Sequence, residues 1–171
     1  GIRILGAMNN EIVTELAQMM GRPVRFGGEF SGVNERASYM ASIAKASLAD
    51  FHVDENNEYK RYIKRLPHGV IFVMAPWNYP YLTAINTIVP ALISGNAVVL
   101  KHSTQTLLAG ERICEAFHQA GVPKNVFKNS YVCVFGSVNS TQSRPNLPPT
   151  QTTTVFQPLS KVDLQDALHT C

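Results

Sequence analysis

The chain has 171 residues and a mass of 18.8 kDa, the size of one globular domain. With 45% hydrophobic and 16% charged residues, it can bury a core without disulfides or a structural metal ion. The formal net charge of +3 is small and no long basic run is present, which argues against nucleic acid as a partner.

No apolar stretch of the sequence is long enough to span a membrane, and the first residues lack the pattern of a signal peptide. Three cysteines, an odd number, favour a reducing compartment over a secreted disulfide framework. We therefore expect a soluble cytoplasmic protein that does not act in or on a membrane.

Two helices are predicted near the start of the chain. From Asn9 to Met20 apolar residues recur at helical spacing, an asparagine stands at the cap position, and Gly21 follows the last turn. The same period runs from Ser31 to Phe51. Both patterns are amphipathic, so each helix is expected to pack on a larger body.

The segment 52–67 is predicted as an exposed strand or a hairpin. A polar turn at 54–57 is followed by apolar residues that are interleaved with four cations, namely Lys60, Arg61, Lys64 and Arg65. These cations either bind an anionic partner or protect an exposed edge strand from pairing, and we favour the protective role.

The centre of the chain predicts a parallel sheet. Residues 69–75 form an uninterrupted apolar run, typical of a parallel strand that is covered on both faces. A helix over 81–94, a second buried strand over 97–101 and a helix over 106–120 are expected to follow. This βαβα order indicates an α/β fold.

The composition changes after about residue 128. Serine, threonine, asparagine, glutamine and proline make up about half of residues 129–171, and only 131–135 has the pattern of a third strand. The run 145–160 predicts a disordered tail.

Two loops are the expected site, because ligands of open α/β sheets bind at the carboxyl ends of the strands. They are Pro76–Pro80 after the first strand and Lys101–Thr104 after the second. Cys114 and His118 lie four apart on a helix and could face one metal ion, but no second pair of ligands completes a site. We favour a core thiol beside a surface imidazole, and expect no metal site.

These loops resemble the aldehyde dehydrogenase superfamily. The similarity rests on Ala75-Pro-Trp-Asn-Tyr-Pro80, on Pro90-Ala-Leu with Gly95-Asn96, and on Val98-Val-Leu-Lys101-His-Ser103, in that order and spacing. A looser similarity runs from about Glu11 to Phe127. The stretch from Glu35 to Met40 is similar to members related to succinate-semialdehyde and benzaldehyde dehydrogenases.

The resemblance implies a function and a fold. The function is oxidation of an aldehyde to a carboxylic acid, with NAD or NADP as the acceptor. Residues 1–128 would be the N-terminal part of the family's cofactor domain, with N-terminal helices and the first half of a Rossmann-like parallel sheet. Within it, 52–67 would be an arm strand that serves oligomerisation.

The resemblance also assigns a catalytic role. Asn78 matches the asparagine whose side-chain amide stabilises the developing oxyanion. From the residues alone, a turn residue is an equally good interpretation of Asn78. Pro76 and Trp77 are similar to the residues that line the nicotinamide side of the cofactor site.

The remaining cofactor residues follow the second strand. Lys101 matches the lysine that contacts the adenosine ribose, where an ammonium can bind sugar hydroxyls or a 2′-phosphate. Ser103 and Thr104 complete the expected cofactor-binding set. Thr104 stands where the family has a ribose-binding glutamate, and His102 replaces a proline, so NAD and NADP both stay open.

Other motifs of the family are missing from the sequence, including the surroundings of the nucleophilic cysteine and of the general base. We therefore expect a truncated chain that is inactive alone, with 129–171 as a tail unrelated to the family. The alternative is a non-catalytic interaction protein that associates with full-length dehydrogenase subunits or with itself.

Overall fold

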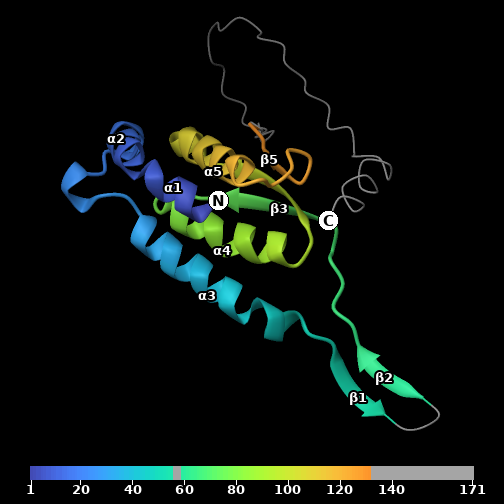
Figure 1. Ribbon diagram of the computed structural model, residues 1–171. Coiled ribbons are helices and arrows are strands. Elements are labelled where there is room, and N and C mark those ends of the chain that lie inside the picture. Colours follow the sequence, from blue (N-terminus) through green and yellow to red (C-terminus); the bar gives the residue numbers. More distant parts are fainter. Residues whose placement is uncertain (56–58, 132–171) are drawn as a thin grey trace, which may run out of the picture. The chain divides into compact units, whose positions relative to one another are not determined.

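The computed structural model describes residues 1–55 and 59–131. Figure 1 shows the arrangement of its helices and strands. In chain order they are α1 (Ile2–Ala7), α2 (Asn9–Met20), α3 (Phe30–Leu48), β1 (Phe51–Glu55), β2 (Lys60–Ile63), β3 (Val70–Ala75), α4 (Pro80–Ile93), β4 (Ala97–His102), α5 (Leu107–Gln119) and β5 (Phe127–Asn129), with short 3₁₀ helices at Val24–Phe26 and Thr104–Thr106.

The helices of the first third largely follow the sequence pattern. Helix α2 has the predicted bounds and ends at Gly21, whose φ of 71° is left-handed, as glycine permits. Helix α3 ends at Leu48, three residues before the predicted end, because Ala49 is already extended with ψ of 147°. The six-residue α1 was not predicted, since it is too short to show a period.

The segment 52–67 contains a hairpin. Strands β1 and β2 pair antiparallel, with Phe51 opposite Ile63, so the hairpin alternative is the one observed. Phe51, Tyr62 and Ile63 are 61%, 52% and 60% exposed. An exposed ion pair of 2.6 Å joins Arg61 to Asp54 across the strands. The hairpin thus exposes both apolar and charged side chains to solvent.

The predicted parallel sheet is confirmed. Strands β3, β4 and β5 are neighbours in that order and all run parallel, with α4 and α5 as the crossovers. The third strand is β5, which begins four residues before the predicted 131–135. Most of the predicted strand and the whole tail predicted to be disordered lie outside the described residues. Phe127 has no exposed surface. Its burial identifies this strand, which the periodicity of the sequence did not predict.

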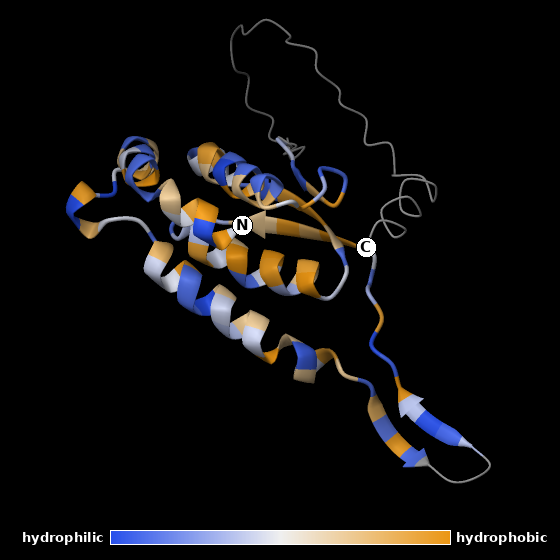
Figure 2. Ribbon diagram, viewed as in Figure 1, coloured by the Kyte–Doolittle hydropathy of each residue, from blue (hydrophilic) through white to orange (hydrophobic). Residues whose placement is uncertain are grey.

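Helices α4 and α5 cover the same face of the sheet. The residues pointing to that face are buried, among them Val73, Leu100 and Phe127, and they form one core with Ile88 of α4 and Ile113 of α5. Helices α1 and α3 pack in turn against α5 and α4. Figure 2 shows how apolar residues concentrate in α4 and β3.

The opposite face of β3 is open in the described part of the chain. Val70, Phe72 and Met74 are 38%, 53% and 72% exposed. We predicted that β3 is covered on both faces. Within residues 1–55 and 59–131 this prediction is wrong, because only one face of the strand is covered. Its apolar run indicated a buried strand, but both helices of the βαβα unit lie on one side, as right-handed crossovers in one direction require.

A turn between α4 and β4 connects the residues that precede β3 and β4. Gly95 has a φ of 82°, which a side chain would strain. Buried Asn96 accepts a hydrogen bond from the Gly69 N–H at 3.0 Å and donates to the Ala91 carbonyl at 3.1 Å. These two hydrogen bonds of Asn96 thus join the end of α4 to the start of β3.

Among the described helices, none has both the length and the apolar character needed to cross a membrane.

Candidate active site

The two predicted loops lie at one edge of the sheet. Strands β3 and β4 run parallel in register, so that Ala75 pairs with His102 at their carboxyl ends. The Ser103 N–H donates to the Ala75 carbonyl at 3.0 Å. Residues 76–80 and 103–106 therefore leave the sheet next to each other, which is the arrangement that a shared site requires.

Asn78 lies in the exposed loop between β3 and α4. Its side-chain Oδ1 accepts a hydrogen bond from the Tyr79 N–H at 3.1 Å, so its Nδ2 donor is turned away from that main chain. Its carbonyl oxygen accepts from Arg22 Nη2 at 2.9 Å. The loop is thus held through its backbone, and in the described part of the chain the Asn78 Nδ2 group donates no hydrogen bond. The oxyanion role of Asn78 stays a prediction.

Pro76 and Trp77 begin the same loop and are exposed, Trp77 by 48%. An indole of this exposure is not a core residue. A flat apolar surface at the carboxyl edge of a parallel sheet suits stacking with a ligand ring.

Lys101, Ser103 and Thr104 follow the second strand. Lys101 is half-buried on the open face, where it pairs in register with Met74. The Ser103 hydroxyl accepts a hydrogen bond from the Gln105 N–H at 3.4 Å and caps the 3₁₀ turn. Thr104 is exposed. A cation and two hydroxyls therefore lie at the end of β4.

His102 connects the two loops from inside. It is 1% exposed, and its Nδ1 accepts from the Ser103 N–H at 3.0 Å. Its Nε2 therefore carries the proton and donates to the Pro80 carbonyl at 3.1 Å. The Thr106 hydroxyl lies 3.1 Å from Nδ1. Burial lowers the pKa of His102 despite the bond to Pro80, and the charge of Lys101 lowers it further.

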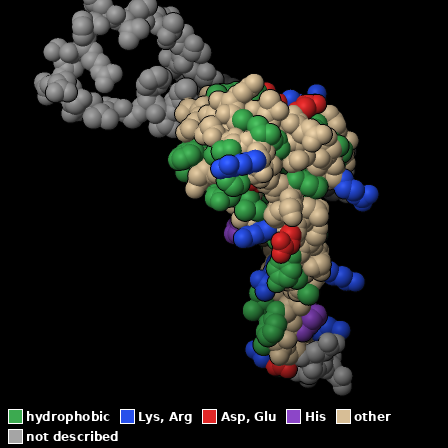
Figure 3. All heavy atoms as spheres, turned by 90° about the vertical axis from the view of Figure 1, so that its left-hand side faces the viewer, with side chains coloured by type: hydrophobic (Ala, Val, Ile, Leu, Met, Phe, Trp, Pro, Cys, Tyr) green, Lys and Arg blue, Asp and Glu red, His purple; other side chains and the backbone are tan. Residues whose placement is uncertain are grey.

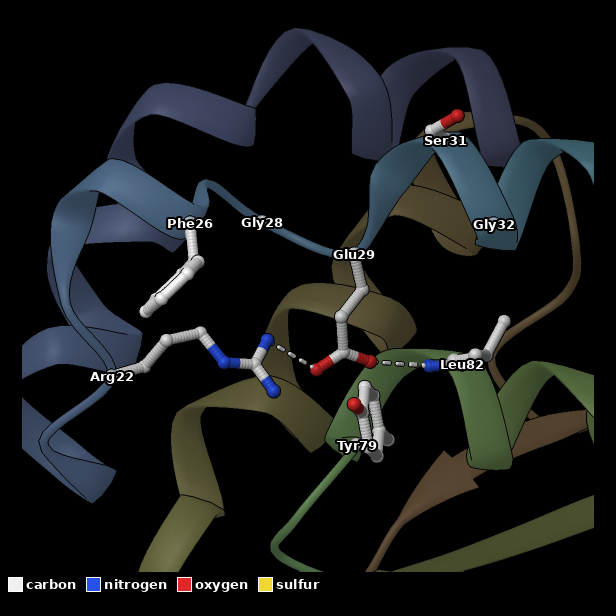
Figure 4. A pocket seen from close by; sticks show the side chains of 8 residues that line it. All are labelled: Arg22, Phe26, Gly28, Glu29, Ser31, Gly32, Tyr79 and Leu82. Carbon is white, nitrogen blue, oxygen red and sulfur yellow. Dashed lines mark hydrogen bonds and ion pairs between the residues drawn. The ribbon is translucent and has the colours of Figure 1, made fainter.

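An ion pair that sequence reasoning missed lies under the Asn78 loop. Glu29 and Arg22 are joined at 2.7 Å, and their side chains are only 4% and 14% exposed. Glu29 also accepts from the N–H groups of Tyr81 and Leu82 at the start of α4. A pocket of about 520 Å³ lies beside the pair (Figure 4). Besides Arg22 and Glu29, its lining residues are Phe26, Gly28, Ser31, Gly32, Tyr79 and Leu82.

Sequence reasoning could not find this pair. Arg22 lies between two helices, Glu29 immediately precedes α3, and Asn78 stands 56 residues after Arg22. A charged residue at a helix boundary is ordinarily solvated. The one available signal is the acidic residue just before the periodic pattern of α3.

The described cysteine lies elsewhere. Cys114 of α5 is 8% exposed, its Sγ lies 3.6 Å from His118 Nε2, and that nitrogen donates to the Phe127 carbonyl at 2.8 Å. Burial raises the pKa of the Cys114 thiol. The thiol therefore faces β5, which β4 separates from β3 and its loop. Across residues 1–55 and 59–131, no three His, Cys, Asp or Glu side chains gather as a metal site would require.

Comparison with known proteins gives a consistent set of relatives. A D-glyceraldehyde dehydrogenase (NADP(+)) of Picrophilus torridus is 33% identical over 98 residues, 57% of this chain and 20% of that protein. The NAD-dependent benzaldehyde dehydrogenase of Corynebacterium glutamicum superposes with a TM-score of 0.67 at 25% identity, over 77% of this chain and 30% of that one. A succinic semialdehyde dehydrogenase of Streptococcus pyogenes, solved with NADP+, has the same fold, with a TM-score of 0.68 at 23% identity over 78% of this chain and 30% of that one.

The chain spans less than a third of the length of each of these relatives. The sequence model of the aldehyde dehydrogenase family matches residues 2–138, which extends past residue 128, where we expected the family-like part to end. The division into 1–128 and 129–171 stays a prediction. This match covers most of the sequence, and the parallel sheet and the relatives agree with it. The chain therefore belongs to the aldehyde dehydrogenase family.

Proposed function

We propose that this chain forms part of the cofactor domain of an NAD(P)-dependent oxidoreductase that converts an aldehyde to a carboxylic acid. The observation that carries the proposal is the meeting of the Asn78 loop and the Lys101–Thr104 segment at one edge of a parallel sheet. The named relatives act on glyceraldehyde, benzaldehyde and succinic semialdehyde.

Asn78 supplies the oxyanion donor in this proposal. Attack of a nucleophile on an aldehyde carbon moves negative charge onto the carbonyl oxygen, and a positioned N–H group stabilises that charge. Loss of one such donor typically costs about 3 kcal/mol of transition-state stabilisation. The Asn78 amide fits this role because its oxygen is engaged by Tyr79 and its backbone by Arg22.

The residues at the end of β4 fit a dinucleotide. Lys101 would donate to ribose hydroxyls or to a 2′-phosphate, and the hydroxyls of Ser103 and Thr104 lie on the same segment. Trp77 and Pro76 would border the nicotinamide. The bound NAD or NADP supplies the hydride acceptor. Because Thr104 brings no carboxylate to repel a 2′-phosphate, we keep both cofactors as candidates.

The 171 residues are expected not to turn over aldehyde by themselves. Cys114, the cysteine of the described residues, is buried and the pKa of its thiol is raised, whereas a nucleophilic cysteine needs an accessible thiolate. Cys133 and Cys171 lie outside the described residues, and the sequence around them does not match the surroundings of the family's nucleophile. Aldehyde-dependent formation of NADH or NADPH by the purified chain would refute this expectation.

The hairpin β1–β2 supports a second proposal, association with another copy or with a full-length dehydrogenase subunit. Figure 3 shows hydrophobic side chains interleaved with basic ones along this arm. Exposed apolar strands favour pairing with another chain. If association is real, Ile63→Asp lowers the mass measured by light scattering, while Val24→Asp at a residue of similar exposure does not. A non-catalytic interaction role would be favoured if the chain associates but binds no cofactor.

The first experiment is a titration with NADH and NADPH that follows the emission of Trp77, the one tryptophan of the sequence. Saturable quenching, beyond that seen with free N-acetyltryptophanamide, is expected. Lys101→Gln should weaken binding about tenfold, since it removes a charged hydrogen-bond donor, whereas Lys124→Gln on the exposed turn before β5 should not. Quenching that does not saturate would reject the cofactor site.

A further inference from the structure

The Arg22–Glu29 pair connects the segment between α2 and α3 to the loop that carries Asn78. Both side chains are largely withdrawn from solvent. A buried ion pair contributes little net stability by itself, because the loss of hydration offsets the attraction. The two charged groups instead bind the backbone of the Asn78 loop and of helix α4.

Glu29 caps helix α4 from a distance of more than fifty residues in the chain. The first N–H groups of a helix lack intrahelical acceptors, and Pro80 at the first position has none to offer. Glu29 Oε2 accepts from the next two, Tyr81 at 3.1 Å and Leu82 at 2.8 Å. A carboxylate at this end also interacts favourably with the helix dipole. Figure 4 shows the carboxylate between Arg22 and the start of α4.

Arg22 extends this cap to the two residues before the helix, Asn78 and Tyr79. One guanidinium nitrogen binds Glu29 Oε1 at 2.7 Å and the other donates to the Asn78 carbonyl at 2.9 Å. The guanidinium carbon lies 5.4 Å from the centre of the Tyr79 ring. A planar fork can serve two acceptors at once in a fixed geometry, which a lysine ammonium on a flexible stem does not reproduce.

The Asn78 loop depends on such backbone anchors because its side chains are exposed. Trp77 and Tyr79 are 48% and 53% exposed, so packing alone does not immobilise them. The loop is held at one end by the Ala75 pairing with the Ser103 N–H and at the other by His102. Arg22 is the group that holds the Asn78 backbone itself.

We propose that Arg22 and Glu29 are positioning residues for Asn78: the guanidinium and carboxylate together fix the Asn78 backbone and the first turn of α4, so that the Asn78 amide keeps one direction. The proposal rests on the oxyanion role proposed above for Asn78. Neither charged group touches the reacting atoms in this proposal.

The test measures amide hydrogen exchange in the purified full chain, by NMR or by mass spectrometry of peptides covering 76–83. Glu29→Gln removes the carboxylate that accepts from the Tyr81 and Leu82 amides, so their exchange is expected to become about tenfold faster or more. Arg22→Gln removes the guanidinium that holds this carboxylate in place, so the same exchange should become faster by a smaller factor. Arg22→Lys keeps the charge opposite Glu29 but loses the fork. It should retain protection of Tyr81 and Leu82, while the emission anisotropy of Trp77 falls.

The matched control is a second ion pair, Arg112 with Glu15, at 2.5 Å and with side chains 27% and 14% exposed. Arg112→Gln removes this pair between α5 and α2. The Arg112 charge acts on the Tyr81 phenol, but its hydrogen bonds go to Glu15 and Glu115 and not to the loop or to the first turn of α4. If it speeds exchange at Tyr81 and Leu82 as much as Arg22→Gln does, the effect is global and the proposal fails. The proposal also fails if Arg22→Gln and Glu29→Gln leave this exchange and the Trp77 anisotropy unchanged.

The cofactor titration separates this proposal from the proposed function. Cofactor binding with unchanged exchange in the variants would reject the anchor alone. A loosened loop in a chain that binds no cofactor would keep the anchor and reject the oxidoreductase role. If Glu29→Gln fails to fold, Arg22→Gln and Arg22→Lys still decide the outcome, since both retain the carboxylate that caps α4.

Discussion

The two faces of the β3–β4 sheet are built from similar residues and have different surroundings. Val73 and Leu100 point to the helices and are 4% and 0% exposed, whereas Phe72 and Met74 on the other face are 53% and 72% exposed. Hydrophobicity is therefore not what separates them. The direction of the two crossovers decides which face the helices cover.

This difference shows where the described residues obtain their stability. Burial of an aliphatic side chain contributes about 2 kcal/mol relative to leaving it exposed, and that gain is realised on the helix-covered face. The open face has apolar groups without that gain, next to Lys101 at its carboxyl end. Contiguous exposed apolar strands of this kind mark surfaces that other chain segments or ligands contact.

Truncation of a residue on the covered face should have the largest effect. Leu100→Ala is expected to lower the free energy of unfolding by about 3 kcal/mol, because it removes buried surface and leaves a cavity. The midpoint of urea unfolding, followed by circular dichroism, measures the change. A loss below about 1 kcal/mol would mean that the core between β4 and the helices is poorly packed.

His102, also on the covered face, should make stability depend on pH. Its pKa is lowered in the folded state by burial, so below pH of about 6.5 the unfolded chain takes up a proton that the folded chain does not. Stability should therefore fall as pH drops below this value. His102→Gln should be less stable than the wild type at pH near 7.5 and should lose part of this pH dependence. Melting temperatures between pH 7.5 and 5 compare the two proteins, and parallel curves would contradict the assignment.

A substitution on the open face should have the smallest effect on stability. Phe72→Thr keeps a strand-favouring side chain and is expected to change the free energy of unfolding by about 0.5 kcal/mol or less. It should also reduce self-association measured by light scattering. If Phe72→Thr destabilises the chain as much as Leu100→Ala, the open face is buried in solution and the comparison between the faces is broken.

The sequence was sufficient for elements with a strong local pattern. Helix α2 has the predicted bounds because its apolar period and Gly21 both mark it. The order of strand and helix from β3 to α5 was also predictable, because buried parallel strands and amphipathic helices alternate there. The loop at 76–80 was recognisable as a candidate site because it directly follows a strand.

Other features required the tertiary structure. Strand β5 is only three residues long, too short for a periodic signal, and Phe127 shows its role through burial alone. The choice between a strand and a hairpin at 52–67 depended on the antiparallel pairing of β1 with β2. No local pattern announces a pairing between two segments.

The sequence by itself determined the secondary structure of the centre of the chain, the α/β class, and the identity of the residues at the two strand ends. These follow from short-range properties, namely side-chain period, helix caps and motif spacing. The tertiary structure alone decided which face of the sheet is covered, that His102 bonds to Pro80, and that Glu29 and Arg22 hold the Asn78 loop. Such contacts join residues tens of positions apart, and their energies arise only when folding brings buried charges and unpaired backbone groups together.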